Sequence, residues 1–234
     1  MKTLLKRMVQ RLRLYRLITT NTAKQLLAGP RCIANVRVPN LLLPPVIHVD
    51  PNKIIYAASV AIKPAKGNAL FLSGDWDQAR QPLSEVETSN SKYVSCRELL
   101  EAHIDLEATQ EYALIMAAIR NSGSYRGCRN EADAMAHVHA RQAFYFAMRQ
   151  NGYKSQAALG GSRYQGEVEC ALDRDGNLIK INAGNHRFAA ARYLGLTSIP
   201  VHLAVIHAEH LRSLSERGLP AVRQLIADVE ARYA

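Results

Sequence analysis

The segment 184–187 (Gly-Asn-His-Arg) has residue types that are suited to binding an anion. It follows a predicted strand and opens a predicted helix, so its backbone N–H groups lie at the positive end of the helix dipole. His186 and Arg187 add side-chain donors, and a guanidinium group fits two phosphate oxygens at once. In the structural alternative, Arg187 pairs with a core carboxylate and His186 is satisfied within the loop. These four residues alone do not decide between the two interpretations.

Two carboxylates flank a tryptophan directly after another predicted strand, in residues 74–77 (Gly-Asp-Trp-Asp). Side chains at alternate positions of an extended segment point the same way, so Asp75 and Asp77 are expected to face one site. Because carboxylate oxygens are ligands for Mg²⁺, this pair predicts a magnesium site. Trp76 is a candidate for stacking on a base or a sugar. In the alternative interpretation Asp75 caps a turn and Trp76 packs in the core.

Basic side chains in two loops are further candidates. Arg126 and Arg129 lie in the loop 123–129, and Lys154 lies in the loop 152–156. Each is a candidate contact for phosphate or substrate, and the alternative for each is a solvated surface group.

The order of elements around the Gly-Asn-His-Arg turn resembles the ParB/sulfiredoxin superfamily. Over residues 167–205 the chain has a strand, the turn, an Ala-rich helix, a Leu-Gly pair and an Ile-Pro-Val strand. In that superfamily the turn binds nucleotide phosphates, which are those of CTP in the ParB branch, ATP in sulfiredoxins and ADP or ATP in related free-amino-acid kinases. The resemblance implies that a nucleoside di- or triphosphate, with ATP the first choice, contacts Gly184, Asn185, His186 and Arg187.

Two departures from the superfamily narrow its implied function. Sulfiredoxins carry a cysteine inside the turn, where this chain has Asn185, which argues against sulfinic-acid repair. Partition proteins of the ParB branch continue into a helix-turn-helix DNA reader, and the roughly thirty residues after Val205 are too few for one. Segments upstream of the turn are similar to an uncharacterised ParB-like group from bacteria, archaea and phages, over about residues 45–207.

The resemblance also implies a reaction. In the kinase-like branch an acidic residue near the nucleotide activates an acceptor hydroxyl, and Glu167 is the candidate here. With the turn as phosphate cradle and the Asp pair as metal site, the expected function is phosphoryl transfer from a nucleotide to a small or glycan hydroxyl. The alternatives are a ParB-like DNA-binding protein or nuclease, and a nucleotide switch without turnover.

Basic charge is concentrated at the N-terminus. Residues 1–66 hold twelve of the thirty Lys/Arg and one of the twenty Asp/Glu, so the remainder carries 18 basic and 19 acidic residues. Residues 3–18 have the period of an amphipathic helix. That helix packs on its own domain, lies on anionic lipid or is a cleaved targeting segment. Nucleic acid is a less favoured partner, because stacking aromatics do not interleave with the basic residues.

Prolines at five positions in residues 29–52 forbid a long helix and predict a linker or extended arm. We therefore expect a basic helix and arm over residues 1–44. A ParB/sulfiredoxin-like domain is expected over 45–234, with a helical insertion at about 95–150. Dispersed cysteines and the lack of a long apolar run favour a cytoplasmic protein. Peripheral contact with the inner face of the membrane is the alternative location, and it depends on the predicted helix 3–18.

Within the expected domain, strands and helices interleave, which predicts an α+β class with a mixed sheet flanked by helices. The expected strands are 53–62, 69–73, 168–172, 178–181 and 199–205, with a hairpin turn at 173–176. The expected helices are 95–120, 131–150, 186–194 and 208–233, the last of them broken near 218–220. Asn130 is the expected N-cap of the second helix, and Gly152 is its expected end.

Overall fold

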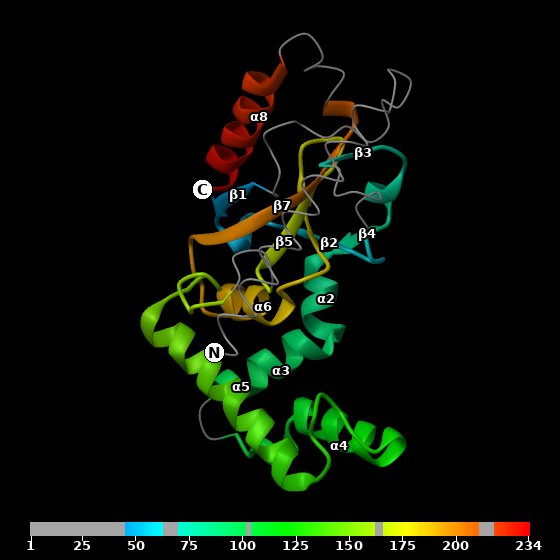
Figure 1. The fold of residues 1–234 in the computed structure, drawn as a ribbon, viewed down its shortest axis with the longest axis vertical. Coiled ribbons are helices and arrows are strands. Elements are labelled where there is room, and N and C mark those ends of the chain that lie inside the picture. Colours follow the sequence, from blue (N-terminus) through cyan, green and yellow to red (C-terminus); the bar gives the residue numbers. More distant parts are fainter. Residues whose placement is uncertain (1–44, 63–69, 102–103, 162–165, 211–217) are drawn as a thin grey trace, which may run out of the picture.

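The computed structural model of the chain describes residues 45–62, 70–101, 104–161, 166–210 and 218–234 (Figure 1). The predictions for residues 1–44, including the basic helix 3–18 and its membrane or nucleic-acid partners, lie outside these residues. None of the helices in the described ranges is long and apolar enough to cross a membrane.

The described residues form a mixed seven-stranded sheet. Six strands follow the order β1-β7-β5-β6-β2-β4, and β3 pairs with β7 off this path. The neighbours β5 and β7 are parallel, as are β2 and β6 and β3 and β7, while the other pairs are antiparallel. The strands are β1 (Val46–Val49), β2 (Tyr56–Ala58), β3 (Phe71–Leu72), β4 (Arg80–Pro82), β5 (Val168–Leu172), β6 (Leu178–Ile181) and β7 (Ile199–His207).

The hairpin of β5 and β6 is confirmed where it was predicted. Asp173 closes its turn, because its Oδ1 accepts from the N–H groups of Asp175 (3.0 Å) and Asn177 (2.6 Å). Gly176 takes a φ of 84°, which a turn of this tightness requires. Both strands are almost wholly buried, as expected for strands inside a sheet that is covered by other elements.

Helices cover the sheet and extend away from it (Figure 1). α6 lies against the strands and α3 packs on α6, with α4 and α5 beyond, while α8 lies beside β1. The helices are α2 (Leu83–Ser89), α3 (Ser91–Leu100), α4 (Gln110–Ser122), α5 (Glu131–Asn151), α6 (Asn185–Tyr193) and α8 (Gly218–Tyr233). Short 3-10 turns are η2 (Pro51–Lys53), η3 (Trp76–Gln78) and η4 (Leu106–Ala108).

Two helix predictions met opposite outcomes. α5 is confirmed with its caps, since the Asn130 side chain accepts from the Asp133 N–H at 2.8 Å and Gly152 follows with a φ of 70°. The single helix predicted over 95–120 is wrong. The chain leaves α3 after Leu100, and Asp105 and Thr109 then cap η4 and α4 with their side chains. Such side chains favour caps over helix interiors, which explains the break.

The proline-rich stretch was predicted as a linker or arm up to residue 52, and its last part is instead structural. β1 is a strand of the sheet, paired with β7, and Pro51 opens η2, where a missing N–H costs nothing. The strand expected over 53–62 is reduced to β2 because η2 occupies its beginning.

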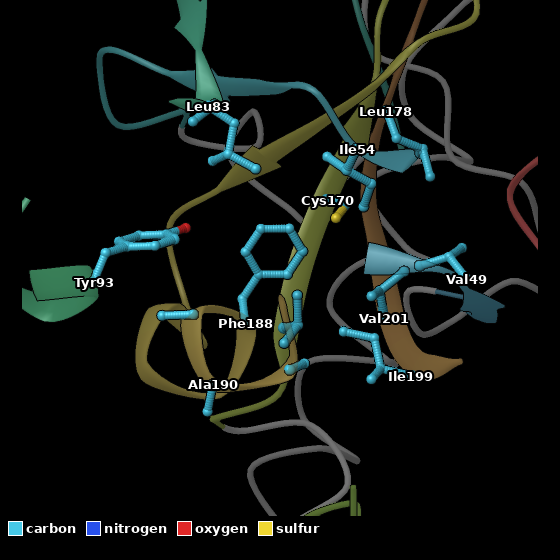
Figure 2. Packing of buried hydrophobic residues seen from close by; sticks show 14 of the residues in the cluster. Val49, Ile54, Leu83, Tyr93, Cys170, Leu178, Phe188, Ala190, Ile199 and Val201 are labelled. Carbon is cyan, nitrogen blue, oxygen red and sulfur yellow. The ribbon is translucent and has the colours of Figure 1, made fainter. Parts of the chain in front are cut away.

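The main core lies between the sheet and α6 (Figure 2). Phe188 points from α6 toward Cys170 of β5, and both side chains are fully buried. The small residues Ala189, Ala190 and Ala191 are also buried, which lets α6 lie close to its neighbours. The site described below therefore lies beside a closely packed part of the core.

Candidate functional site

Gly184 begins the site, at the junction of β6 and α6. It has a φ of 78°, and a Cβ atom there would lie 2.5 Å from the Val168 Cα and 2.6 Å from the Glu167 carbonyl oxygen. Only glycine fits such a close approach between two backbones. The turn is therefore pressed against the first residue of β5.

The N-terminus of α6 is uncapped. Gly184 makes no side-chain capping bond, and the first intrahelical donor is the Phe188 N–H, which bonds the Gly184 carbonyl at 2.9 Å. The preceding N–H groups in the first turn have no intrahelical acceptor. Asn185 lies at the first helical position, half-buried. The predicted turn from strand to helix is therefore present at Gly184, and its binding of an anion stays a prediction.

Arg187 points inward. Its side chain is 7 % exposed, its Nη1 donates to the Lys154 carbonyl at 2.9 Å, and the same atom lies 3.5 Å from Glu167 Oε2. The guanidinium also lies over the rings of Phe144 and Tyr153, at 5.6 and 5.3 Å. This is the structural alternative raised for Arg187, a buried pair with a core carboxylate.

Glu167 is the partner in that pair and is itself buried. Its Oε2 accepts from the Tyr153 hydroxyl at 2.8 Å, and its Oε1 accepts from the Gln156 N–H. Burial, with the adjacent Glu167 charge, raises the pKa of Tyr153, so that hydroxyl keeps its proton. The arrangement holds the segment after α5 against α6. Lys154 contributes a carbonyl to it, while its side chain is exposed.

The partly buried side chain of His186 contacts α5. Its Nδ1 lies 2.8 Å from the Tyr145 hydroxyl. Burial, together with the positive charges of Arg141, Lys92 and Arg126, lowers the pKa of His186 to about 3. The imidazole is therefore neutral at physiological pH and can serve as a hydrogen-bond donor but not as a cation.

Two of the cations near His186 have no acidic partner among the described residues. Arg141 is paired with Glu111 at 3.3 Å, whereas neither Lys92 nor Arg126 forms an ion pair with an acid in the described ranges. Arg126 has a φ of 49° in the tight turn between Tyr125 and Cys128, a left-handed conformation that is strained for a residue with a side chain. The predicted site residue Arg126 thus shares the electrostatic surroundings of His186.

Sequence patterns did not point to Lys92 or Lys180. Lys92 lies two residues after Asn90, the cap of α3, and only the packing of α3 on α6 brings it near the turn. Lys180 is buried in β6 and donates to the carbonyls of Ile181 and Ala183, which fixes the approach to Gly184. Burial lowers its pKa to about 8. The sequence signal that could have identified Lys180 is its position as a charged residue within the apolar run of β6.

The Gly-Asp-Trp-Asp segment forms a different cluster. Residues 76–78 form a 3-10 turn and are not extended. Both carboxylates contact Arg174, whose Nη2 lies 2.6 Å from Asp75 Oδ1 and 2.7 Å from Asp77 Oδ1. Desolvation opposes the charge of the buried Asp77, but hydrogen bonds from Arg174 lower its pKa overall. One arginine therefore occupies the carboxylates that were predicted to hold Mg²⁺, and this geometry does not fit a metal site.

Trp76 belongs to the same cluster. Its Nε1 donates to the Leu72 carbonyl at 3.1 Å, and its ring lies 5.7 Å from that of His207. It packs on a small apolar group on the sheet, which includes Ala171 and Val205. These contacts correspond to the packing alternative for Trp76.

The structure does not bring the two motifs together. Gly184 contacts the beginning of β5, whereas Arg174 follows the end of that strand and binds the Asp pair. A five-residue strand spans about 16 Å. In the described part of the chain, no group of three or more His, Cys, Asp or Glu side chains is arranged to hold a metal ion.

Comparison with known proteins found no match among protein-family models, curated proteins or solved structures.

Proposed function

We propose that the N-terminus of α6 binds the phosphate groups of a nucleotide, as the resemblance to the ParB/sulfiredoxin superfamily implies. The observation that carries the proposal is the first turn of α6, which has no side-chain cap and which the close contact of Gly184 with the backbone of β5 holds in place. The N–H groups of this turn lack an intrahelical acceptor, and such groups at the positive end of a helix dipole favour an anion. A nucleoside di- or triphosphate, ATP first, is the ligand class.

The charges around the turn suit such a ligand. Lys92 and Arg126 supply positive charge without an acidic partner in the described ranges, while backbone N–H groups and the neutral His186 supply hydrogen bonds. Arg187 acts through the fold, because it ties α6 to the Lys154 carbonyl and Glu167. Charge neutralisation and positioning are the main contributions that phosphoryl transfer needs from protein.

The proposed reaction is phosphoryl transfer to a small or glycan hydroxyl. A bond forms between the acceptor oxygen and the terminal phosphorus, the bond to the bridging oxygen breaks, and the hydroxyl proton passes to a base. Glu167 remains the candidate base because its residue adjoins the cradle. To take that proton, its carboxylate must exchange a contact with Tyr153 or Arg187 for the acceptor hydroxyl.

Asp75 and Asp77 have no part in this proposal, since Arg174 already binds them at the other end of β5. Mg²⁺ is assigned to the nucleotide itself, whose phosphate oxygens are the ligands that this ion commonly takes from a substrate.

A nucleotide screen by thermal denaturation tests binding. With Mg²⁺ present, ATP, ADP or CTP is expected to raise the melting temperature, because a ligand that binds only the folded state stabilises it. Asn185→Asp places a negative charge in the first turn, which favours the helix dipole but repels phosphate. The shift should disappear in that variant and persist in Gln224→Glu, which makes the same charge change on exposed α8.

Two outcomes would contradict the binding proposal: no nucleotide shifts the melting temperature, or the shift is the same in Asn185→Asp. Turnover is tested separately with ATP labelled at the terminal phosphate and a panel of hydroxyl acceptors. Transfer of label supports the phosphotransferase. Binding with neither transfer nor release of phosphate indicates a nucleotide switch.

A further inference from the structure

We propose that Tyr145 is a positioning residue that holds His186 in the tautomer protonated on Nε2, so that this N–H donates to a phosphate oxygen of the bound nucleotide. The inference rests on the proposed function for its ligand. It gives a residue of α5, which lies outside the Gly-Asn-His-Arg motif, a role in orienting His186 of that motif.

The contact between the two side chains is well defined. Tyr145 is fully buried in α5, and its hydroxyl lies 2.8 Å from His186 Nδ1. Cys96 of α3 is also buried and interacts electrostatically with Tyr145. The hydrogen bond between Tyr145 and His186 joins α5 to the first turn of α6.

The protons of Tyr145 and His186 can be assigned from chemistry. Burial raises the pKa of Tyr145 and raises that of Cys96 to about 12, so both groups keep their protons. His186 is neutral and holds one proton, on either nitrogen. The phenol hydroxyl can donate to the imidazole nitrogen or to the sulfur, and nitrogen is the stronger acceptor. Tyr145 therefore donates to Nδ1.

This assignment leaves the remaining proton of His186 on Nε2. Among the described residues Nε2 has no hydrogen-bond partner, although the residue stands in the first turn of α6 beside open backbone N–H groups. A neutral N–H donor adds a hydrogen bond to an anion without adding charge next to Lys92, Arg126 and Arg141. Without Tyr145, the imidazole could place its proton on Nδ1 and present a lone pair to the phosphate instead.

Nitrogen NMR of histidine-labelled protein tests the tautomer without any ligand. In the wild type, His186 should show a protonated Nε2 and an unprotonated Nδ1. Tyr145→Phe should give a mixture of both tautomers while keeping the fold, since only one oxygen is removed. Tyr233→Phe is the matched control: it removes another buried hydroxyl, which accepts from the Leu178 N–H, and should leave the His186 signals unchanged. A wild-type proton on Nδ1 would overturn the assignment.

Calorimetric titration with ATP and Mg²⁺ tests the role in binding. Because only the form protonated on Nε2 can donate to the phosphate, Tyr145→Phe should bind ATP more weakly by the inverse of its Nε2-protonated fraction, about twofold for an even mixture, with Tyr233→Phe unchanged. Equal affinity of wild type and Tyr145→Phe, despite a changed tautomer, would overturn the positioning role. If wild-type protein binds no nucleotide, the proposed function and the ligand in this inference both fail, and the NMR result then shows whether the tautomer assignment still holds.

Discussion

Gly184 lies at a position where the backbone excludes every side chain. Its φ of 78° is unfavourable for an L-residue, and its missing Cβ makes room for Val168 and Glu167. Gly184→Ala should therefore destabilise the protein by more than about 3 kcal/mol, because backbone strain adds to a clash that only movement of β5 or α6 can relieve. Urea unfolding of both proteins measures this free energy.

Gly195 is a matched control for that substitution. It also has a positive φ, of 64°, but a Cβ there would meet nothing within 4 Å. Gly195→Ala should cost only the conformational strain, about 1 kcal/mol. If the two variants lose similar stability, the close approach at Gly184 does not constrain the turn.

The neutral state of His186 predicts a pH dependence of stability. Its folded-state pKa of about 3 lies below the value of about 6.5 for a histidine in an unfolded chain. Between these values the unfolded chain binds more protons, so the stability due to His186 is fully present above pH 6.5 and is lost as pH falls toward 3. The slope reaches about 1.4 kcal/mol per pH unit.

Urea unfolding at pH 7, 6 and 5 measures this slope, with His186→Gln as the comparison. The wild type should lose stability faster than the variant as the pH falls. The pKa of Asp77 is lowered below its ordinary value of 3.8, so its contribution changes only below this range. Parallel curves for the two proteins would contradict a buried neutral histidine.

At the scale of elements, the hairpin turn of β5 and β6 joins the sheet to η3 through Arg174. This arginine contacts both Asp75 and Asp77, and the second of these is buried. Arg174→Met should lower the urea midpoint because a buried carboxylate loses its partner. Asp75→Asn removes only an exposed carboxylate and should have the smaller effect.

The same variant separates this cluster from the proposed site. Since Arg174 and Gly184 contact opposite ends of β5, Arg174→Met should keep its nucleotide dissociation constant within about twofold of the wild type, the spread that additivity allows for distant sites. A much weaker nucleotide affinity in the folded variant would return the Asp pair to the binding site.

Elements set by neighbouring residues were predictable from the sequence. The β5–β6 hairpin follows from its turn residues, and α5 follows from Asn130 and Gly152, because each signal acts within a few positions of the chain. The Gly184 turn was predicted for the same reason. The break between α3 and α4 was missed because apolar periodicity continues across it.

Partners distant in sequence were not predictable. Tyr145 and His186 are 41 residues apart, Arg174 and Asp77 are 97 apart, and no local pattern names either pair. The residue types of the site were therefore identified without their partners. Arg187 forms an ion pair with Glu167, and the Asp pair binds Arg174, so these distant partners determine the role of each group.

At the scale of the molecule, α6 links the sheet to the helices beyond it. It packs on β5 through Phe188 and on α3, and its first turn is joined to α5 and the following segment by His186 and Arg187 (Figures 1 and 2). A ligand at this turn therefore contacts the region where the sheet and the helices α3 and α5 meet. It should reduce local opening on both sides of that region.

Hydrogen exchange with and without ATP and Mg²⁺ tests this expectation. At a ligand concentration one hundred times the dissociation constant, amides of α6 and of residues 140–156 that exchange by local opening should slow by up to about one hundredfold. Local exchange in η3 should stay the same, because the Asp75–Arg174 cluster lies at the other end of β5. Slower exchange in η3 with no change in α6 would place the nucleotide at the Gly-Asp-Trp-Asp segment and overturn the proposed site.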